Sequence, residues 1–242
     1  MPETFDLFLK IRRYDPRTKR SRVQGYDLKA GRILRFVDLF RRINEDLDPS
    51  LAWNSSCEHG QCGSCAVLVN GRPLLACELL VENAVRDFGT TVFYIQPLDN
   101  LPVARDLMID FGSAYDKVNR AKPFLVEPRR PRPEEGLTPI TPRTMDLYGE
   151  ATRCINCFCC ASACISGRGR FLGPNALLAT IVKAMDQREV NKEEHRRVIY
   201  GPEGVARCHT SRACSHVCPK EIDVAHFLAL AKEGRYSEKE TR

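Results

Sequence analysis

The chain of 242 residues is 43% hydrophobic and 28% charged, with a formal net charge of +6 at pH 7. This composition is typical of a soluble globular protein with one large or two ordinary domains. No stretch approaches about 18 consecutive apolar residues, so we expect no membrane-spanning helix. The modest positive charge does not by itself indicate nucleic-acid binding, and it fits an acidic partner or an anionic membrane face equally well.

The twelve cysteines carry the most information. Disulfide scaffolds occur mostly in short secreted chains. The N-terminal residues Met-Pro-Glu-Thr-Phe-Asp lack a basic start followed by an apolar stretch, so we expect no signal peptide. Cytosolic thiolates bound to metal are therefore the better interpretation.

The first part of the chain predicts a small α+β domain. Alternating apolar residues indicate strands, and apolar residues at helical spacing indicate amphipathic helices. Asn70-Gly71 supplies the two positive-φ positions of a tight turn and predicts a hairpin. The expected elements are strands at 5–11, 23–28 and 92–96, helices at 33–47 and 104–118, and a hairpin of 66–69 with 73–76.

A proline-rich connection follows. Six of the fifteen prolines lie between Pro123 and Pro142, and proline both blocks helix interiors and stiffens extended chain. We therefore expect domains at 1–122 and 144–242 joined by residues 123–143. This connection is either a linker or an arm laid over a partner.

The second domain is expected to be helical. Pro174 can begin a helix that carries apolar residues as far as Met185, and residues 222–231 predict a short closing helix. The charged residues 233–242 are expected to be frayed.

The first cysteine group has the C-x4-C-x2-C-x11-C spacing of plant-type [2Fe–2S] ferredoxins. Gly60 and Gly63 allow the loop to approach a cluster closely, and the last cysteine arrives from beyond the hairpin. A four-cysteine zinc site is the less favoured alternative. The predicted [2Fe–2S] ligands are Cys57, Cys62, Cys65 and Cys77.

The other two groups form an internal repeat with an offset of 54 residues, from Cys154 to Cys208 and from Cys164 to Cys218. In two-cluster ferredoxins the fourth cysteine of each run ligates the other cluster. A [4Fe–4S] cluster is therefore predicted on Cys154, Cys157, Cys160 and Cys218. The second site would have Cys164, Cys208 and Cys214.

Ser211 stands where the repeat calls for the fourth thiolate of this second site. A cubane corner without a thiolate readily loses its iron, so we expect a [3Fe–4S] cluster there. The alternative is a fourth iron bound by the Ser211 oxygen or by water, which matches the soft cluster poorly.

The remaining candidate residues have simpler interpretations. Cys159 is expected to be a buried small thiol, and Trp53 to pack in the core. His209 follows a predicted cluster ligand and is of more interest. The histidines expected to be structural or solvated are His59, His195, His216 and His226.

These motifs resemble the iron–sulfur subunit of the succinate dehydrogenase and quinol:fumarate reductase family, the complex II family. The segment 101–107 (Leu-Pro-Val-Ala-Arg-Asp-Leu) and the segment from Thr138 to Cys154 are also similar. The resemblance covers nearly the whole chain, and all eleven predicted ligands match.

The resemblance implies a β-grasp ferredoxin domain followed by an all-α, bacterial-ferredoxin-like domain. It implies a flavoprotein partner with covalent FAD, on which succinate and fumarate interconvert. It also implies a membrane anchor, expected to be a dihaem cytochrome b, where quinone reacts. The chain would then be a peripheral subunit on the cytoplasmic face of the cell membrane, relaying electrons in the tricarboxylic acid cycle or in anaerobic respiration.

Two positions depart from the family pattern. Ile165 follows Cys164 where relatives often have proline, and Gly169 stands where many ubiquinone-linked relatives have a quinone-lining tryptophan. His209 resembles a histidine near the quinone in those relatives and is a possible contact on the quinone or haem side. The departures favour a menaquinone-linked enzyme nearer to fumarate reductases.

Two other functions compete with this interpretation. One is an electron-transfer subunit of another flavoenzyme complex, of the glycolate-oxidase or heterodisulfide-reductase type. Such chains usually carry two complete cysteine runs, so Ser211 argues against it. The other is a zinc-stabilised nucleic-acid-binding protein, which iron and acid-labile sulfide analysis would distinguish; we expect no nucleic-acid partner.

Overall fold

The computed structural model describes residues 3–131, 134, 136, 138 and 140–235. The chain forms two compact units, and each is described separately below. Unit 1 comprises Met1–Phe111 and Ile155–Ala163, and unit 2 comprises Gly112–Cys154 and Cys164–Arg242. The domain limits expected from the sequence stay a prediction.

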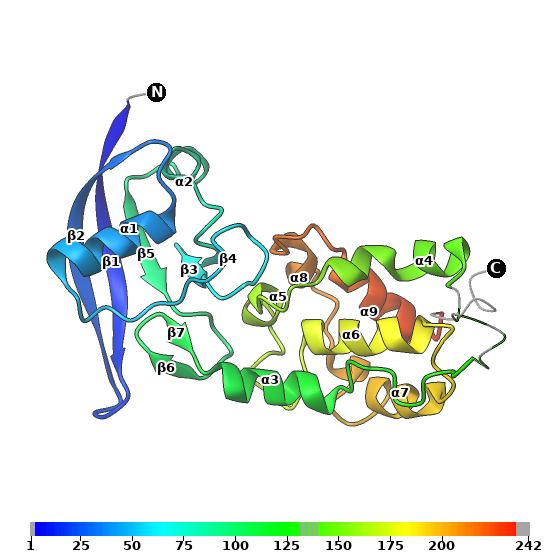
Figure 1. Ribbon diagram of the computed structural model, residues 1–242. Coiled ribbons are helices and arrows are strands. Elements are labelled where there is room, and N and C mark those ends of the chain that lie inside the picture. The colour runs from blue at the N-terminus through cyan, green and yellow to red at the C-terminus, as the bar shows by residue number, and fades with distance from the viewer. Residues whose placement is uncertain (1–2, 132–133, 135, 137, 139, 236–242) are drawn as a thin grey trace. The chain divides into compact units, whose positions relative to one another are not determined.

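Unit 1 is built on a five-stranded mixed sheet in the order β2-β1-β5-β3-β4 (Figure 1). Strand β5 pairs parallel with β1 and antiparallel with β3, and so joins two antiparallel hairpins, β1–β2 and β3–β4. The strands are β1 (Thr4–Asp15), β2 (Arg20–Gly31), β3 (Ala66–Val69), β4 (Arg72–Leu75) and β5 (Val92–Gln96). The predicted strand at 92–96 is confirmed. The predicted hairpin is confirmed too, and its turn residues Asn70 and Gly71 both have positive φ.

The core of unit 1 lies between this sheet and helix α1 (Phe36–Arg42), which crosses one face of it (Figure 1). Leu7, Leu9 and Ile11 alternate into the core from β1. The ring of Phe36 meets that of Phe93 edge-on at 5.3 Å. The short helix α2 (Val81–Phe88) ends at Gly89 in the left-handed conformation.

The predicted helix at 33–47 is shorter and changes type. The Asp38 carboxylate accepts a hydrogen bond from the Arg35 backbone N–H, so α1 begins at Phe36, and Ile33 stays outside it at 70% exposed. The helix then widens into the π-turn η1 (Ile43–Leu47). Ile43 is buried in this turn, whereas Leu47, which the helical spacing places on the same face, is 52% exposed.

The helix predicted at 104–118 is wrong over its first part. Residues Val103–Arg105 and Met108–Ile109 form the small hairpin β6–β7, and helix α3 runs only over Phe111–Arg120. Asp106 turns this hairpin at φ 46°, and its carboxylate accepts the backbone N–H groups of Tyr14 and Ala52. These long-range partners override the local helical spacing.

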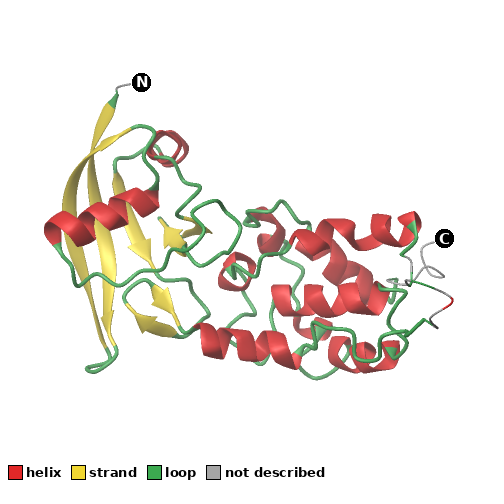
Figure 2. Ribbon diagram, viewed as in Figure 1, coloured by secondary structure: helices red, strands yellow, loops and turns green. Residues whose placement is uncertain are grey.

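Unit 2 is helical, as Figure 2 shows. The predicted helix from Pro174 to Met185 is confirmed as the buried α6. The predicted closing helix corresponds to α9, and residues 236–242 of the expected frayed end lie outside the described residues. The other elements are α4 (Pro142–Tyr148), η3 (Gly149–Arg153), α7 (Lys192–Ile199), η4 (Val205–Arg207), α8 (Ala213–His216) and α9 (Val224–Lys232).

The described part of the proline-rich connection lies along unit 2. Buried Glu189 accepts the backbone N–H groups of Val126 and Glu127 and pairs with His195 at 2.8 Å. Pro128 forms a β-bridge with Glu189. Residues 126–128 are therefore fastened to this unit.

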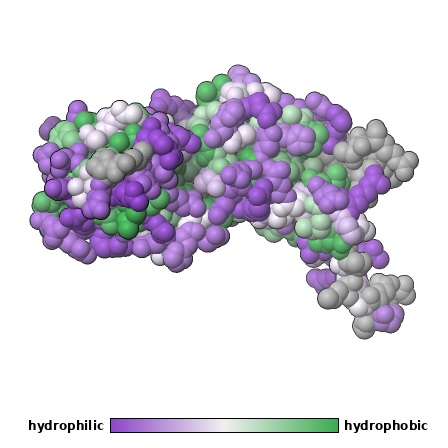
Figure 3. Space-filling model, turned by 90° about the horizontal axis from the view of Figure 1, so that it is seen from above, coloured by the Kyte–Doolittle hydropathy of each residue, from purple (hydrophilic) through white to green (hydrophobic). Residues whose placement is uncertain are grey.

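The face shown in Figure 3 is largely hydrophilic, with hydrophobic residues exposed in smaller groups. In the described part of the chain, none of the helices has the length and apolar character required to cross a bilayer.

Candidate iron–sulfur sites

Three cysteines of the first group lie in the loop between η1 and β3, and Cys77 follows β4, all within unit 1. Positive φ angles at Glu58, Gly60 and Gly63 curl this loop. Cys65 and Cys77 are buried, and Cys62 is exposed. All twelve cysteines belong to the described residues, and none of them forms a disulfide.

The backbone of this loop directs N–H groups at two sulfur atoms. His59, Gln61 and Cys62 donate to the Cys57 Sγ at 3.3–3.4 Å, and Gly60 donates to the Cys77 Sγ at 3.3 Å. Such donors stabilise negative charge on sulfur and suit cluster thiolates. The donor set therefore fits a [2Fe–2S] cluster.

The pKa values of the Cys62 and Cys65 thiols also fit a metal-binding loop. Burial raises the pKa of Cys65 to about 12, so its thiolate is costly unless a metal takes up the charge. Partial burial acts against ionisation of Cys62 too, but hydrogen bonding with Ser64 lowers the pKa of that thiol to about 6.

Charged contacts from α1 hold the loop. The Arg41 guanidinium lies 2.5 Å from the Glu58 carboxylate, and Arg35 donates to the Glu58 carbonyl at 3.0 Å. Glu58 is the loop residue held at φ 57°. The ion pair therefore supports the turn that gathers N–H groups around Cys57.

The second cysteine group reaches the first through Gly63. A Cβ atom on Gly63 would lie 2.6 Å from the Cys157 Cα, so the two backbones touch within unit 1. Cys157 and Cys160 flank the start of the short helix α5 (Cys159–Ser162), and both are buried. Only glycine permits this approach at position 63.

The third site is a hollow within unit 2. Cys164, Cys208 and Cys214 line it together with Ser211 and His209. Burial, reinforced by the nearby Cys208, raises the pKa of Cys214 to about 11, and the Thr210 backbone N–H donates to the Cys208 Sγ at 3.4 Å. Three convergent sulfurs and a hydroxyl in place of a fourth fit a cluster with an incomplete corner.

The internal repeat extends to the backbone. Asn156 and Phe158 have positive φ. Thr210 and Arg212, which lie 54 residues after them, have positive φ as well. Helices α5 and α8 begin at the same offset, after Phe158 and Arg212 in nearly identical left-handed conformations. The sequence repeat is thus a repeat of cluster-binding loop geometry.

The remaining predicted [4Fe–4S] ligands, Cys154 and Cys218, belong to unit 2, whereas Cys157 and Cys160 belong to unit 1. This ligand set stays a prediction. Among the described residues, no three His, Cys, Asp or Glu side chains are close enough to hold one metal ion. Cluster ligands lie farther apart than the ligands of one ion, because sulfides separate the irons.

The other candidates are placed as follows. Cys159 is fully buried, as expected, and His209 is exposed at the rim of the third hollow. Trp53 packs against Phe40 with ring centroids 5.7 Å apart. The buried pair of His195 with Glu189 shows that this histidine is structural.

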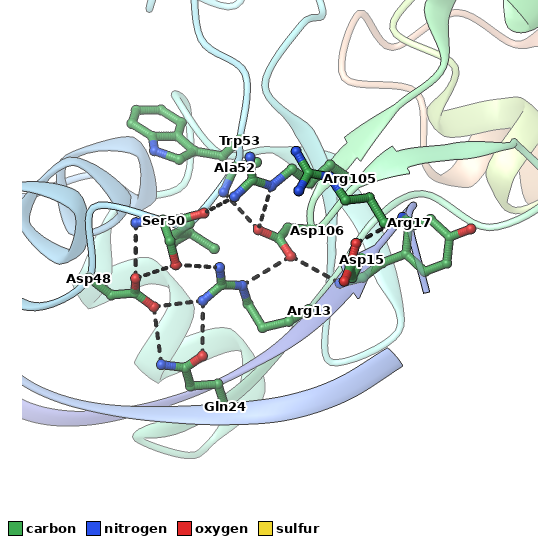
Figure 4. Close-up of polar contacts among 12 residues, drawn as sticks. Arg13, Asp15, Arg17, Gln24, Asp48, Ser50, Ala52, Trp53, Arg105 and Asp106 are labelled. Atoms are coloured by element: carbon green, nitrogen blue, oxygen red, sulfur yellow. Dashed lines mark hydrogen bonds and ion pairs between the residues drawn. The ribbon is translucent and has the colours of Figure 1, made fainter. Parts of the chain in front are cut away.

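Arg13 is a buried charge that the sequence interpretation missed (Figure 4). It lies 2.6 Å from Asp48 and 3.0 Å from Asp106, and it donates to Gln24, Tyr26 and Ser50. Its position continues the apolar alternation of β1, where a cation is unusual. That break in the pattern was the available signal.

Comparison with known families agrees with this geometry. Residues 8–116 match the "2Fe-2S iron-sulfur cluster binding domain" family, and residues 150–222 match the "4Fe-4S dicluster domain" family. The chain is therefore an iron–sulfur protein with a ferredoxin-like β domain followed by a helical dicluster domain, and the predicted fold class is confirmed.

Individual relatives narrow the class. The chain is 31% identical to a fumarate reductase iron–sulfur subunit of Mycobacterium tuberculosis, covering 93% of this chain and 91% of the relative. It is 30% identical to the corresponding subunit of Haemophilus influenzae, with the same two coverages. A chain of the Mycobacterium smegmatis Sdh1 complex in the apo form superposes with a TM-score of 0.82 at 26% identity, covering 96% of each chain. The chain belongs to the iron–sulfur subunit family of succinate dehydrogenase and fumarate reductase.

Proposed function

We propose that this chain relays electrons through three clusters between a flavoprotein and a membrane anchor in a quinone-linked fumarate reductase or succinate dehydrogenase. When bound, the clusters supply one-electron transfer, and the protein supplies spacing, hydrogen bonds and burial. The proposed ligands are the eleven cysteines predicted above, with Ser211 facing the vacant corner of a [3Fe–4S] cluster. Dicarboxylate chemistry belongs to the partner flavoprotein with its covalent FAD.

The contact between Gly63 and Cys157 carries this proposal. It joins the loop of the first cysteine group to the start of the second within one unit. An electron relay needs neighbouring clusters at close range. Because Gly63 has no side chain, the backbone of the first cysteine loop can lie directly against Cys157, a predicted ligand of the second cluster. The hollow with Cys164, Cys208 and Cys214 supplies the exit site of the same relay.

The finer assignments follow from the family. We propose a peripheral position on the cytoplasmic face of the cell membrane, against an anchor with haem b and menaquinone. His209 at the rim of the third hollow is the proposed residue on the quinone or haem side. Gly169, in place of a quinone-lining tryptophan, supports menaquinone rather than ubiquinone.

Metal analysis and EPR of the purified holoprotein test the relay. Iron with acid-labile sulfide, an oxidised three-iron signal, and two further signals after dithionite reduction are expected. Zinc without sulfide would overturn the cluster assignment. A fully four-iron second domain would overturn the role of Ser211 while leaving the relay in place.

A further inference from the structure

The β1–β2 hairpin concentrates the positive charge of the chain. Residues 10–22 hold seven lysines and arginines against a single acidic residue, Asp15. The resulting net charge of this segment equals the +6 of the whole chain. No predicted cluster ligand lies in the segment, so the proposed electron relay does not explain it.

Much of this charge converges on one place. A hollow of about 640 Å³, open to solvent, is lined by five arginines and two aspartates together with five uncharged residues. One of the five, Arg13, is buried and already paired with Asp48 and Asp106. We call the other four, which are exposed, the arginine hollow: Arg17, Arg20, Arg22 and Arg105.

The two aspartates of the hollow carry two negative charges against its five guanidinium groups. Asp15 accepts hydrogen bonds from the backbone N–H of Arg17 and from the Thr18 hydroxyl. Asp106 accepts the backbone N–H groups of Tyr14 and Ala52 and pairs with Arg13 (Figure 4).

The arginine side chains themselves find few partners. Arg22 donates to Gln24 at 3.2 Å. Arg105 donates to the Ser50 carbonyl at 3.0 Å and lies 3.9 Å from the Asp106 carboxylate. Within the part of the chain that the structure describes, the guanidinium groups of Arg17 and Arg20 make no hydrogen bond or ion pair.

The strand arrangement accounts for only part of the hollow. Arg13 and Arg22 are directly opposite on β1 and β2, but the charge of Arg13 is already paired with Asp48 and Asp106. Because β2 is an edge strand, its charges also discourage pairing with other chains. Protection of the β2 edge does not explain why Arg17 and Arg105, which lie outside β2, line the same hollow.

We propose that the arginine hollow binds carboxylate side chains of an acidic segment on a partner protein. Guanidinium groups pair with carboxylates through two parallel hydrogen bonds. The four arginines come from the hairpin and from β6, which suits several carboxylates along an extended chain better than one compact anion. Residues 15–22 (Asp-Pro-Arg-Thr-Lys-Arg-Ser-Arg) contain no glycine for a phosphate-cradling loop and no large apolar side chain to enter a bilayer.

The test measures binding of fluorescein-labelled decaglutamate to the holoprotein by fluorescence anisotropy at low and high salt. The hollow variant combines Arg17→Gln, Arg20→Gln and Arg22→Gln. The control variant combines Arg32→Gln, Arg72→Gln and Arg86→Gln, which removes equal charge from exposed arginines elsewhere in unit 1. The [2Fe–2S] absorbance of each variant verifies that it folds.

The hollow variant should bind decaglutamate about tenfold more weakly than the unmodified protein, and the control variant within about twofold of it. Binding to the unmodified protein should weaken as salt is raised. Equal weakening in both variants would overturn the proposal, because net charge alone would then explain binding. Tighter binding of inorganic triphosphate, or of anionic phospholipid vesicles, at the same residues would overturn the assignment to carboxylates.

Discussion

Arg13 shows how one side chain can organise a domain. It occupies the position on β1 after Leu7, Leu9 and Ile11, where the core face reaches its end. Its guanidinium joins Asp48, next to the π-turn, to Asp106, in the β6–β7 turn. Three chain segments that are distant in sequence are thereby held together.

Arg13→Met should destabilise the holoprotein by about 3 kcal/mol, because it leaves the buried Asp106 carboxylate and the half-buried Asp48 carboxylate without their cation. Guanidinium chloride unfolding monitored by tryptophan fluorescence measures the change. Arg12→Gln, on the opposite face of the same strand, should stay within about 0.5 kcal/mol of the unmodified protein. Equal losses in the two variants would contradict the role of Arg13.

Ser211 decides the chemistry of the third site at the scale of one atom. It lines the hollow shared by Cys208 and Cys214, in a loop whose backbone repeats that of Cys157. Ser211→Cys supplies the missing soft ligand, so the oxidised three-iron EPR signal should give way to a four-iron signal on reduction. An unchanged oxidised spectrum would show that the vacant corner lies elsewhere.

At the scale of elements, the cysteine loops depend on left-handed residues. Glu58, Gly60 and Gly63 bend the first loop. Phe158 and Arg212 immediately precede the short helices α5 and α8. Non-glycine residues at positive φ carry a conformational cost of about 1 kcal/mol each. Bound clusters and contacts such as Arg41 with Glu58 offset that cost.

Gly63→Ala tests the contact between the first two loops. The added methyl would meet the Cys157 backbone at 2.6 Å, so the [2Fe–2S] signal should shift or lose intensity, and the second cluster should be perturbed with it. Gly71→Ala is the matched control, since Gly71 also has positive φ (80°), but no described atom lies within 4 Å of its added Cβ. Equal effects in both variants would assign the loss to backbone strain alone.

Elements were predicted well where local pattern and tertiary contacts agree. The hairpin across Asn70-Gly71 needed only its turn residues and alternating neighbours. The β6–β7 hairpin could not be predicted, because its turn at Asp106 depends on N–H groups from Tyr14 and Ala52, which are distant in sequence. A helical period over a few residues cannot register such partners.

At the scale of the whole molecule, several carboxylates make stability depend on pH. Burial alone would raise the pKa of Asp48 and of Glu189. Hydrogen bonds from Ser50, Tyr26 and Arg13 lower the pKa of Asp48, and those from His195 and backbone N–H groups lower the pKa of Glu189. The unfolded chain therefore binds protons at a higher pH than the folded one, and this contribution is lost as pH falls.

The free energy of unfolding of the holoprotein should thus change little from these groups above about pH 5 and decline below about pH 4. Glu189→Gln should flatten part of that decline and lower stability at neutral pH by about 1–3 kcal/mol, because it weakens the hold on residues 126–127. Denaturant midpoints across this pH range measure both effects. Glu193→Gln, at an exposed site, should leave the dependence of stability on pH unchanged. If Glu189→Gln declines as steeply at low pH as the unmodified protein, the Glu189 carboxylate does not contribute to the acid loss of stability.

Ligand chemistry and fold class could be read from the chain alone, because cysteine spacing and the 54-residue repeat are local properties that a cluster imposes directly on neighbouring residues. The arrangement of Arg13 with its two aspartates, the contact of Gly63 with Cys157 and the arginine hollow became visible only in three dimensions. Each of these features brings together residues that are far apart in sequence. Hydrophobic periodicity does not predict such contacts, because they depend on how the strands and loops pack.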